Sequence, residues 1–339
     1  MKIAKRSDPN SLRLVNDQSQ PNINEVWTAT KDMDAIRLNI KTLGYELARS
    51  LAARLPQRTD LTPVEVGLRS KASTQADLES DWVAFWLSEL KVPVVFHRKL
   101  WELAYVLQAI YESGHLREGQ RGLGFGCGAE PIPSYLAAHG VNVTITDLPP
   151  ARGGQMGWVS TNQHAGSLDA VHMPHLVDKR DFVNRASLRF VDMNAIPRDL
   201  TGYDFCWSIC AFEHLGSIEK GLDFVENSLR TLKPGGLAVH TTEFNFWNDA
   251  ETIDNWTTVL FQKRHFTLLA ERLRRAGHHV AELDFDVGDK PLDKFIDIPP
   301  YLHDLTPEQR RFIGEDANHI KLTIDGFPST CFALKIVKA

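Results

Sequence analysis

The sequence predicts an α/β fold built on a mostly parallel β-sheet, and three observations carry this prediction. From residue 121 onward, short hydrophobic stretches alternate with helical patterns, as strands and crossover helices do. The first stretch runs into the glycine-rich turn GFGCG, residues 124–128, where missing Cβ atoms allow a tight turn and close approach to a ligand. Asp147 follows after about 20 residues, the separation at which an acid ends the second strand of a nucleotide-binding unit.

The N-terminal third predicts helices rather than strands. Residues 1–30 are polar and contain Pro9 and Pro21, so we expect a loosely ordered arm. Residues 31–118 predict a helical accessory region, with helices over 32–55, 75–90 and 97–114. In the first of these helices, apolar residues recur at the spacing of one helical face, which predicts that this face packs against the rest of the protein. The apolar residues concerned are Met33, Ile36, Ile40, Leu43, Leu47 and Leu51.

Residues 119–339 predict the sheet domain. The expected strands lie near 121–126, 141–147, 187–192, 203–209, 236–243, 278–287 and 330–337. Two long connections interrupt the pattern as insertions, at about 149–185 and 288–329. The second is rich in proline and glycine near its start, so we expect it to be irregular and to form a lid over the substrate.

Composition excludes several classes of protein. The 38 Lys and Arg against 43 Asp and Glu give a formal charge of -5 without a long basic run, which argues against nucleic acid as the main partner. The four cysteines show no CxxC spacing, so we expect free thiols in a reducing compartment. No signal-peptide pattern and no apolar run of about 18 residues is present, which predicts a cytoplasmic protein without a membrane span.

Five motifs in the expected order carry a resemblance to a known family. They are the glycine turn, Asp147, the pair Asp192-Met193, FEHL (212–215) and LKPGG (232–236). From about residue 122 to the end, the chain resembles the class I methyltransferases that depend on S-adenosylmethionine. The resemblance implies a Rossmann-like sheet of seven strands in the order 3-2-1-4-5-7-6, with the last strand antiparallel. It also implies S-adenosyl-L-methionine as cofactor and S-adenosyl-L-homocysteine as product.

A narrower resemblance concerns the acceptor. GLGFGCGAEP, TDL, STNQHA, VDMNAIP, EHLGSIEKGLDFVENSL and VHTTEFN together are similar to bacterial methyltransferases associated with glycan and surface-polysaccharide synthesis. This resemblance implies O-methylation of a sugar or glycan precursor.

The cofactor-binding candidates follow the motifs of the resemblance. They are Gly124, Gly126, Cys127, Gly128, Glu130, Asp147, Leu148, Asp192, Met193, Ser208 and Cys210. Two positions depart from the family pattern, because Gly124 stands where an acid is common and Glu130 stands at the usual third glycine. Glu130 precedes Pro131 and could simply complement the dipole of the following helix. The alternative is that Glu130 contacts the amino group of the cofactor.

A sugar hydroxyl needs a base to become a good nucleophile, and three residues are candidates for this role. His214 follows the fourth strand, and imidazole titrates near neutral pH. Glu243 and His240 lie near the end of the fifth strand, where alternation places them on opposite faces, so only one of the two can readily face the pocket. For each residue, packing or hydrogen bonding without catalysis is the alternative.

Substrate-binding candidates are Arg98, Trp158, Gln163 and Glu213, with solvated charge or surface packing as the alternative for each. The oxygen donors of Asp192, Glu213 and Glu243 also suit Mg²⁺. No recognisable ligand spacing joins them, so the sequence favours a site without metal.

Other functions fit parts of the sequence. A small secondary metabolite is the alternative acceptor. A nucleotide-binding module of the same fold without catalysis, or a nicotinamide oxidoreductase, would share the glycine turn. An oxidoreductase gives the FEHL and KPGG stretches no role. The oligomeric state is left open.

Overall fold

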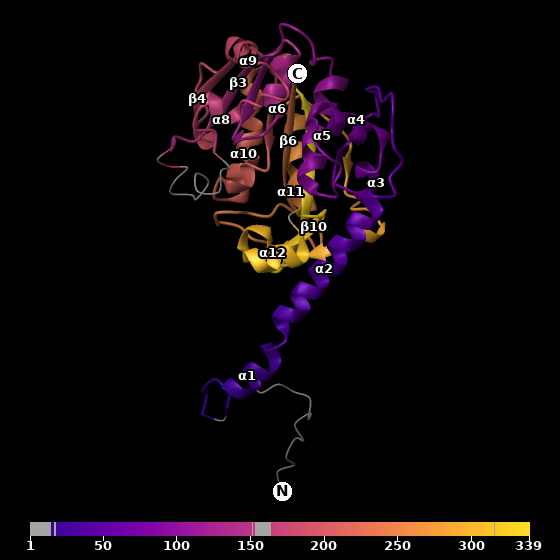
Figure 1. Cartoon of the computed structure of the whole chain (residues 1–339). Helices are drawn as coiled ribbons and strands as arrows, with labels where there is room; N and C mark the ends of the chain where they lie inside the picture. The colour runs from indigo at the N-terminus through magenta and orange to yellow at the C-terminus, as the bar shows by residue number, and fades with distance from the viewer. Residues whose placement is uncertain (1–14, 17, 151, 153–163, 315) are drawn as a thin grey trace.

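The computed structural model describes residues 15–16, 18–150, 152, 164–314 and 316–339. Its centre is a nine-stranded sheet flanked by helices, from which a helical rod projects (Figure 1). The strands of this sheet are β2 (Arg121–Phe125), β3 (Asn142–Asp147), β4 (Ala186–Phe190), β5 (Tyr203–Ile209), β6 (Leu232–Asn245), β7 (His279–Val280), β9 (Ile296–Asp297), β10 (Lys321–Ile324) and β11 (Phe327–Val337).

The sheet has the predicted strand order. Its path is β4-β3-β2-β5-β6-β11-β10-β9, and β7 also pairs with β11. The first five strands of this path are parallel to their neighbours, whereas β11 runs antiparallel to β6. The protein therefore has the α/β, Rossmann-like fold with a reversed last strand that the resemblance implied.

Helices cover both faces of the sheet. They are α3 (Gln75–Leu78), α4 (Asp81–Glu89), α5 (Arg98–Glu112), α6 (Ile132–Ala138), α8 (Leu168–Val171), α9 (Lys179–Arg185), α10 (Ile218–Ser228) and α11 (Lys263–Arg275). A further helix, α12 (Pro307–Ile313), packs in a smaller core with Tyr45 and Leu305. The wholly buried strand β5 shows how the sequence forms two cores. Phe205, Trp207 and Ile209 pack with the α4, α5 and α6 side, whereas Tyr203 and Cys206 pack with the α10 and α11 side.

The strand predicted over 278–287 is wrong in its extent. It divides into β7 and β8 (Leu283–Asp284), and β8 pairs in parallel with β1 (Ser70–Lys71) in a separate two-stranded sheet. The reason lies at the edge of β11, where Ala72 forms a bridge with Phe332. This N-terminal segment occupies the edge along which the predicted strand would have continued.

The 288–329 insertion was expected to be irregular, but it contains regular elements. It contributes β9, β10, α12 and two short 3₁₀ turns, η4 (Pro291–Asp293) and η5 (Leu302–Asp304). Asp325 and Gly326 both have positive φ, 46° and 86°, and they connect β10 to β11 as a tight hairpin. An Asp-Gly pair between two apolar stretches is a strong signal for such a hairpin.

The N-terminal region also differs from its prediction. Residues 23–30 form a helix, α1 (Ile23–Thr30), and α2 (Met33–Ala52) follows it after a short turn. Five of the six apolar residues expected to face the core of the protein are exposed, and Leu51 is half-buried. The other face of α2 docks instead, because Lys41 Nζ lies 2.5 Å from Asp297 Oδ1 and the Tyr45 hydroxyl donates to Asp297 Oδ2 at 2.9 Å.

Among the described residues, no helix combines the length and the apolar character that crossing a membrane requires.

Candidate functional site

A cavity of about 1240 Å³ opens at the carboxyl ends of β2, β3, β5 and β6. Ligand pockets typically measure roughly 300–1,000 Å³, so this cavity is larger than the usual pocket for one small ligand. Residues from the sequence-predicted site that line it are Arg98, Gly126, Cys127, Gly128, Glu130, Asp147, Leu148, Asp192, Met193, Cys210, Glu213, His214 and Glu243.

The glycine turn forms part of the cavity wall with its backbone. Gly126 and Gly128 have φ of 59° and 54°, in the left-handed region that favours glycine. A Cβ added at Gly126 would lie 2.9 Å from the Ala211 Cβ and 3.4 Å from the Met193 sulfur. A side chain there would have to displace its neighbours, so the turn keeps this approach to the cavity open for a ligand.

Asp147 ends β3 beside this turn. One carboxylate oxygen accepts hydrogen bonds from the amides of Gly128 (3.2 Å) and Ala165 (2.9 Å), and the other accepts from the Leu148 amide (2.7 Å). The carboxylate is thus held rigidly across from the glycine turn, where an acid can accept hydrogen bonds from ribose hydroxyls.

Asp192 and Met193 lie at the same edge, after β4. Burial opposes the ionised form of Asp192, but Arg152 Nη1 lies 2.6 Å from Asp192 Oδ2 and holds the carboxyl pKa below its usual value. The Asn194 amide donates to the other carboxylate oxygen at 2.9 Å. Asp192 is therefore an ionised, fixed acceptor next to the apolar Met193, which suits a flat polar ring such as adenine.

Glu130 sits at the entrance of α6. Its carboxylate accepts from Trp207 Nε1 at 3.4 Å, and the N-cap residue of the helix is Pro131. Burial raises the pKa of Glu130 to about 8, although Lys99 opposes this shift. At neutral pH without ligand the acid holds its proton, and a cationic group entering the cavity would favour its ionisation. This arrangement favours the ligand-contacting alternative over simple helix capping.

Cys210, directly after β5, has a strained backbone. Its φ is 44°, unusual for a residue with a side chain, and its amide donates to the Thr241 carbonyl at 3.0 Å. The thiol lies 2.9 Å from Glu102 Oε2 and 3.7 Å from the Cys331 sulfur. All four cysteines of the chain are free thiols, as expected.

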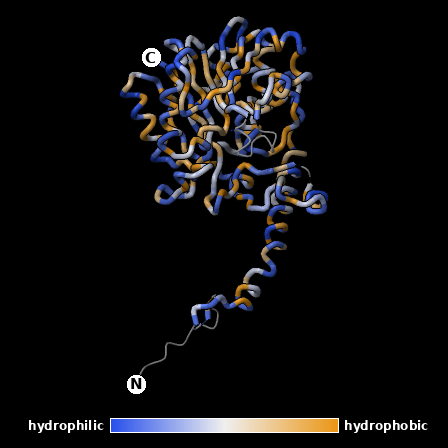
Figure 2. The backbone as a smooth tube through the Cα atoms, turned by 90° about the vertical axis from the view of Figure 1, so that its left-hand side faces the viewer, coloured by the Kyte–Doolittle hydropathy of each residue, from blue (hydrophilic) through white to orange (hydrophobic). Residues whose placement is uncertain are grey.

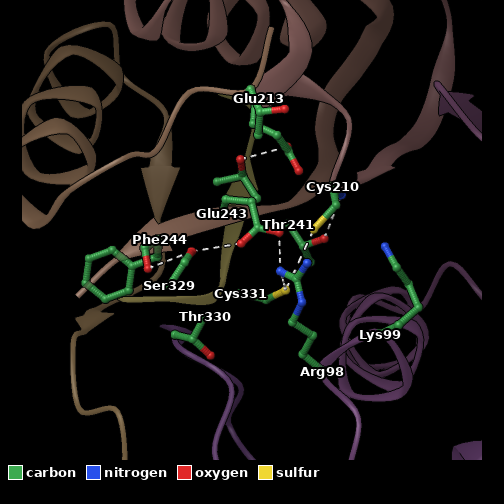
Figure 3. A network of polar contacts seen from close by, with 12 residues as sticks. Arg98, Lys99, Cys210, Glu213, Thr241, Glu243, Phe244, Ser329, Thr330 and Cys331 are labelled. Carbon is green, nitrogen blue, oxygen red and sulfur yellow. Dashed lines mark hydrogen bonds and ion pairs between the residues drawn. The ribbon is translucent and has the colours of Figure 1, made fainter. Parts of the chain in front are cut away.

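Helix α5 brings two cations to the acidic tip of β6 (Figure 3). Arg98 Nη1 forms an ion pair with Glu243 and lies 3.4 Å from the Cys331 sulfur. The second oxygen of Glu243 accepts from the Ser329 hydroxyl at 2.8 Å. Lys99 Nζ lies 3.4 Å from Glu102 Oε1. Glu243 is thus engaged on both oxygens, which suits a positioning role better than that of a base.

The short turn η2 (Phe212–His214) places Glu213 and His214 at the cavity. His214 Nδ1 lies 3.0 Å from the Thr257 carbonyl. The Thr258 hydroxyl lies 3.2 Å from the same nitrogen. Since a carbonyl can only accept, the contact with Thr257 favours the tautomer with its proton on Nδ1. Glu213 accepts from the Thr242 hydroxyl at 2.9 Å, and burial raises its carboxyl pKa.

Three predicted residues lie away from the cavity. His240 is wholly buried, with Nδ1 2.8 Å from the Ser208 hydroxyl and Nε2 3.1 Å from the Ser228 hydroxyl. Burial lowers its pKa to about 3, so this ring is neutral. Strand alternation turns His240 away from the cavity and Glu243 toward it, so only one of the two faces the cavity, as expected.

The other two residues are Ser208 and Gly124. The Ser208 hydroxyl forms its hydrogen bond with His240, and Gly124 is packed against Cys127 and Trp207. Trp158 and Gln163 lie outside the described residues.

Two groups among the described residues bring three possible metal ligands together. They are Glu102, Cys210 and Cys331, and Cys210, Glu213 and Glu243, with ligand atoms within 4.8 Å of one another. The hydrogen bond to Cys331 and burial raise the pKa of the Cys210 thiol, and Arg98 already occupies Glu243. A protonated thiol and a nearby guanidinium both disfavour a cation, so neither group makes a strong metal site.

Sequence reasoning missed several lining or supporting residues. Glu102 stands one helical turn after Arg98 and Lys99, and this spacing could have placed it on the same face. Arg152 and Trp256 come from connections without a regular pattern, and no signal marked them. Their contribution depends on how the loops close over the sheet.

Comparison with known proteins identifies the region around this cavity. A family model described as a methyltransferase domain matches residues 101–282, more than half of the chain. No match was found among the curated proteins.

Several solved structures are similar. One from Galdieria sulphuraria, assigned as a sarcosine dimethylglycine methyltransferase, has 14% identity and a TM-score of 0.42, covering 77% of this chain and 99% of that chain. A SAM dependent methyltransferase from Aquifex aeolicus has 15% identity and a TM-score of 0.35, with coverage of 69% and 89%. The phosphoethanolamine N-methyltransferase 2 of Haemonchus contortus, in complex with S-adenosyl-L-methionine, has 16% identity and a TM-score of 0.38, with coverage of 68% and 51%.

Proposed function

Since the chain belongs to the methyltransferase-domain family and uses S-adenosyl-L-methionine as methyl donor, we propose that it methylates a hydroxyl of a sugar or glycan precursor. The observation that carries the acceptor class is the polar lining of the cavity. Arg98, Glu213, Glu243 and His214 line it, and so does the exposed Trp256. Fixed charges that bind hydroxyl groups, together with an aromatic face, suit a sugar ring.

The donor binds at the glycine-turn side of the cavity in this proposal. Asp147 accepts from the ribose hydroxyls, and Asp192 with Met193 holds the adenine. Glu130 receives the ammonium group of the donor. The bound donor supplies an electrophilic methyl group on a sulfonium, and the protein supplies alignment, which contributes on the order of 7–11 kcal/mol in favourable cases.

His214 is the general base of the proposed reaction. With its Nδ1 proton donated to the Thr257 carbonyl, the Nε2 lone pair accepts the proton of the acceptor hydroxyl. The hydroxyl oxygen then forms a bond to the methyl carbon, and the electron pair of the breaking carbon–sulfur bond stays on sulfur. A placed base contributes roughly 10²- to 10⁴-fold in rate.

Arg98 and Glu243 position the acceptor. Their ion pair borders the cavity, so the guanidinium can donate to acceptor oxygens and the carboxylate can receive acceptor hydroxyls. The pair restrains both side chains before a ligand enters. This arrangement supports an acceptor with hydroxyl groups. A small secondary metabolite that carries hydroxyl groups is the alternative to a sugar or glycan precursor.

A methylation assay tests the proposal. The full chain is incubated with isotopically labelled S-adenosylmethionine and separate pools of sugar nucleotides, glycans, hydroxylated small molecules and amines. A gain of one labelled methyl group in a sugar-containing product, absent with the Asp147→Ala variant, is the expected result. Transfer only to amines, or only to compounds without a sugar, would contradict the proposed acceptor.

The base is tested with His214→Asn, whose amide can still donate to the Thr257 carbonyl. We expect kcat to fall by about 10²- to 10⁴-fold while the Kd of the donor stays within about twofold. His139→Asn, on the exposed end of α6, is the matched control and should leave kcat unchanged. Unchanged turnover in His214→Asn would remove this residue from proton transfer.

A further inference from the structure

The helices α1 and α2 form a rod that projects from the body of the protein (Figure 1). Apolar residues recur along the rod beyond the body (Figure 2). The exposed fractions are 37% for Val26, 37% for Met33, 48% for Ile36, 40% for Ile40, 72% for Leu43 and 39% for Leu47. Helices in proteins gain most of their stability from packing of an apolar face, so a rod with an open apolar stripe would be stabilised by a partner.

The stripe has the spacing of a coiled-coil seam. Val26, Ala29, Met33, Ile36, Ile40, Leu43 and Leu47 follow one another in alternating steps of three and four residues. In heptad notation, Val26, Met33, Ile40 and Leu47 occupy a positions, and Ala29, Ile36 and Leu43 occupy d positions. Such a repeat packs against another helix that carries the same repeat.

The body of the protein does not cover this seam. It packs against a different face of α2, formed by Lys41, Gly44, Tyr45 and Ala48, which lies about a third of a turn away from the seam. A Cβ on Gly44 would lie 2.1 Å from the Phe295 ring, so α2 lies directly on the body there. The docked face fixes the start of the rod and leaves the seam turned outward.

We propose that the seam residues of α2, Met33 to Leu47, form a parallel two-stranded coiled coil with a second copy of this chain, and that Val26 and Ala29 of α1 continue the repeat beyond the turn at Lys31 and Asp32. The flanking charges support this partner and orientation. In a parallel pair, the g residue Asp32 of one copy lies near the e residue Arg37 of the other, which attracts. At present Arg37 Nη1 has only a loose, exposed ion pair with Asp34 Oδ1 at 3.8 Å.

An antiparallel pair would place g residues against g residues. The g residues of this seam are Glu25, Asp32, Asn39 and Glu46, all acidic or neutral, so this orientation gains no attraction. A membrane surface also fits poorly. Between residues 23 and 52, the charges that remain outside the buried Lys41 pair are Glu25, Lys31, Asp32, Asp34, Arg37, Glu46 and Arg49, and this set offers no basic face for anionic lipids.

The molecular mass of the full chain tests the proposal, measured by sedimentation equilibrium or light scattering at micromolar concentration. We expect twice the chain mass of 38.2 kDa for the natural sequence. The double variant Ile36→Glu, Leu43→Glu places charge at two d positions and should reduce the mass to that of one chain. Trp27→Glu replaces an equally exposed apolar residue off the seam and should leave the mass doubled.

Two further measurements define the orientation and the fold. The Ile36→Cys variant, oxidised with oxidised glutathione, should form a covalent dimer, because identical d positions face each other only in a parallel, in-register pair. The double variant should keep its donor affinity and the thermal midpoint of the body, which separates loss of the dimer from misfolding.

The results that overturn the proposal are equally specific. A mass of one chain, or of any number other than two, for the natural sequence contradicts the dimer. A dimer that persists in the double variant contradicts the seam, and failure of Ile36→Cys to cross-link contradicts the parallel orientation. Binding of a monomeric natural chain to vesicles of phosphatidylcholine and phosphatidylserine would assign the stripe to a membrane instead.

Discussion

Two clusters of buried charge in this protein have opposite designs. In the docking cluster, Asp297 is wholly buried and contacts Lys41, Tyr45 and His319, which closes the cluster on itself. In the cavity cluster, Arg98 pairs with Glu243 and Lys99 with the buried Glu102, yet Arg98, Lys99 and Glu243 line the cavity. The two clusters are neighbours, because the Arg98 amide donates to the His319 carbonyl at 3.1 Å.

The difference separates a structural role from a functional one. A closed buried ion pair has no group left for a ligand, and removing one partner leaves an uncompensated charge. An open cluster keeps groups that a ligand can use, and it holds acids such as Glu130 and Glu213 with raised pKa values. The docking cluster should therefore affect stability, and the cavity cluster should affect binding and turnover.

The largest effect is expected from Lys41→Met. This change leaves the Asp297 carboxylate buried without its cation, so the free energy of unfolding should fall by about 3 kcal/mol. Urea unfolding measures it, and the fraction that remains folded should keep its donor affinity. Adding Asp297→Asn to Lys41→Met should restore at least half of the loss. A change below about 1 kcal/mol in the single variant would mean that the cluster contributes little.

A smaller effect is expected from Glu243→Gln. The amide keeps the shape of the side chain but loses the charge that holds Arg98. The KM of the acceptor should rise by about 10- to 100-fold, which corresponds to about 1.4 to 2.7 kcal/mol. The free energy of unfolding should change by no more than about 1 kcal/mol, because the Arg98 side chain is 17% exposed and lines the cavity. A lower free energy of unfolding with an unchanged KM would show that Glu243 stabilises the fold and does not bind the acceptor.

The smallest effect is expected from Glu130→Gln and depends on pH. The raised pKa means that the folded protein holds the proton where the unfolded chain releases it. The stability due to the neutral acid is thus complete below about pH 4.5 and is lost as pH rises toward 8. Between pH 5.5 and 7.5, the free energy of unfolding should fall by about 1 kcal/mol less in the donor-free variant than in the natural protein. The expected difference is this small because Glu130 is partly exposed. Thermal melts at both pH values measure this difference, and parallel curves would contradict it.

Local patterns in the sequence predicted the sheet and several residues that line the cavity, among them Gly126 and Asp147. The turn at Gly126, the acid at Asp147 and the strand order each depend on residues close together in the chain. The charge clusters could not be predicted in this way. Arg98 and Glu243 are 145 positions apart, and Lys41 and Asp297 are 256 apart. Only the packing of α2 and α5 on the sheet brings these partners together.

Hydrophobic periodicity had two different outcomes. In α10, Leu222 and Val225 recur at helical spacing and are buried in the core. In α2, Ile36 and Leu43 have the same kind of spacing but are exposed. Periodicity identifies which face of a helix is apolar, but the identity of its partner depends on tertiary contacts. Lys41, a residue that single-sequence reasoning assigns to solvent, anchors the helix instead.

The insertion at 288–329 has a consequence for aggregation. An open sheet edge can recruit strands from other molecules, and this insertion adds β10 and β9 beyond β11. β9 has only two residues and is followed closely by Pro299 and Pro300, whose nitrogens cannot donate to another strand. The sheet therefore ends at a short edge that resists uncontrolled self-association. A chain with an exposed apolar rod can then assemble through helices while this edge of its sheet stays protected.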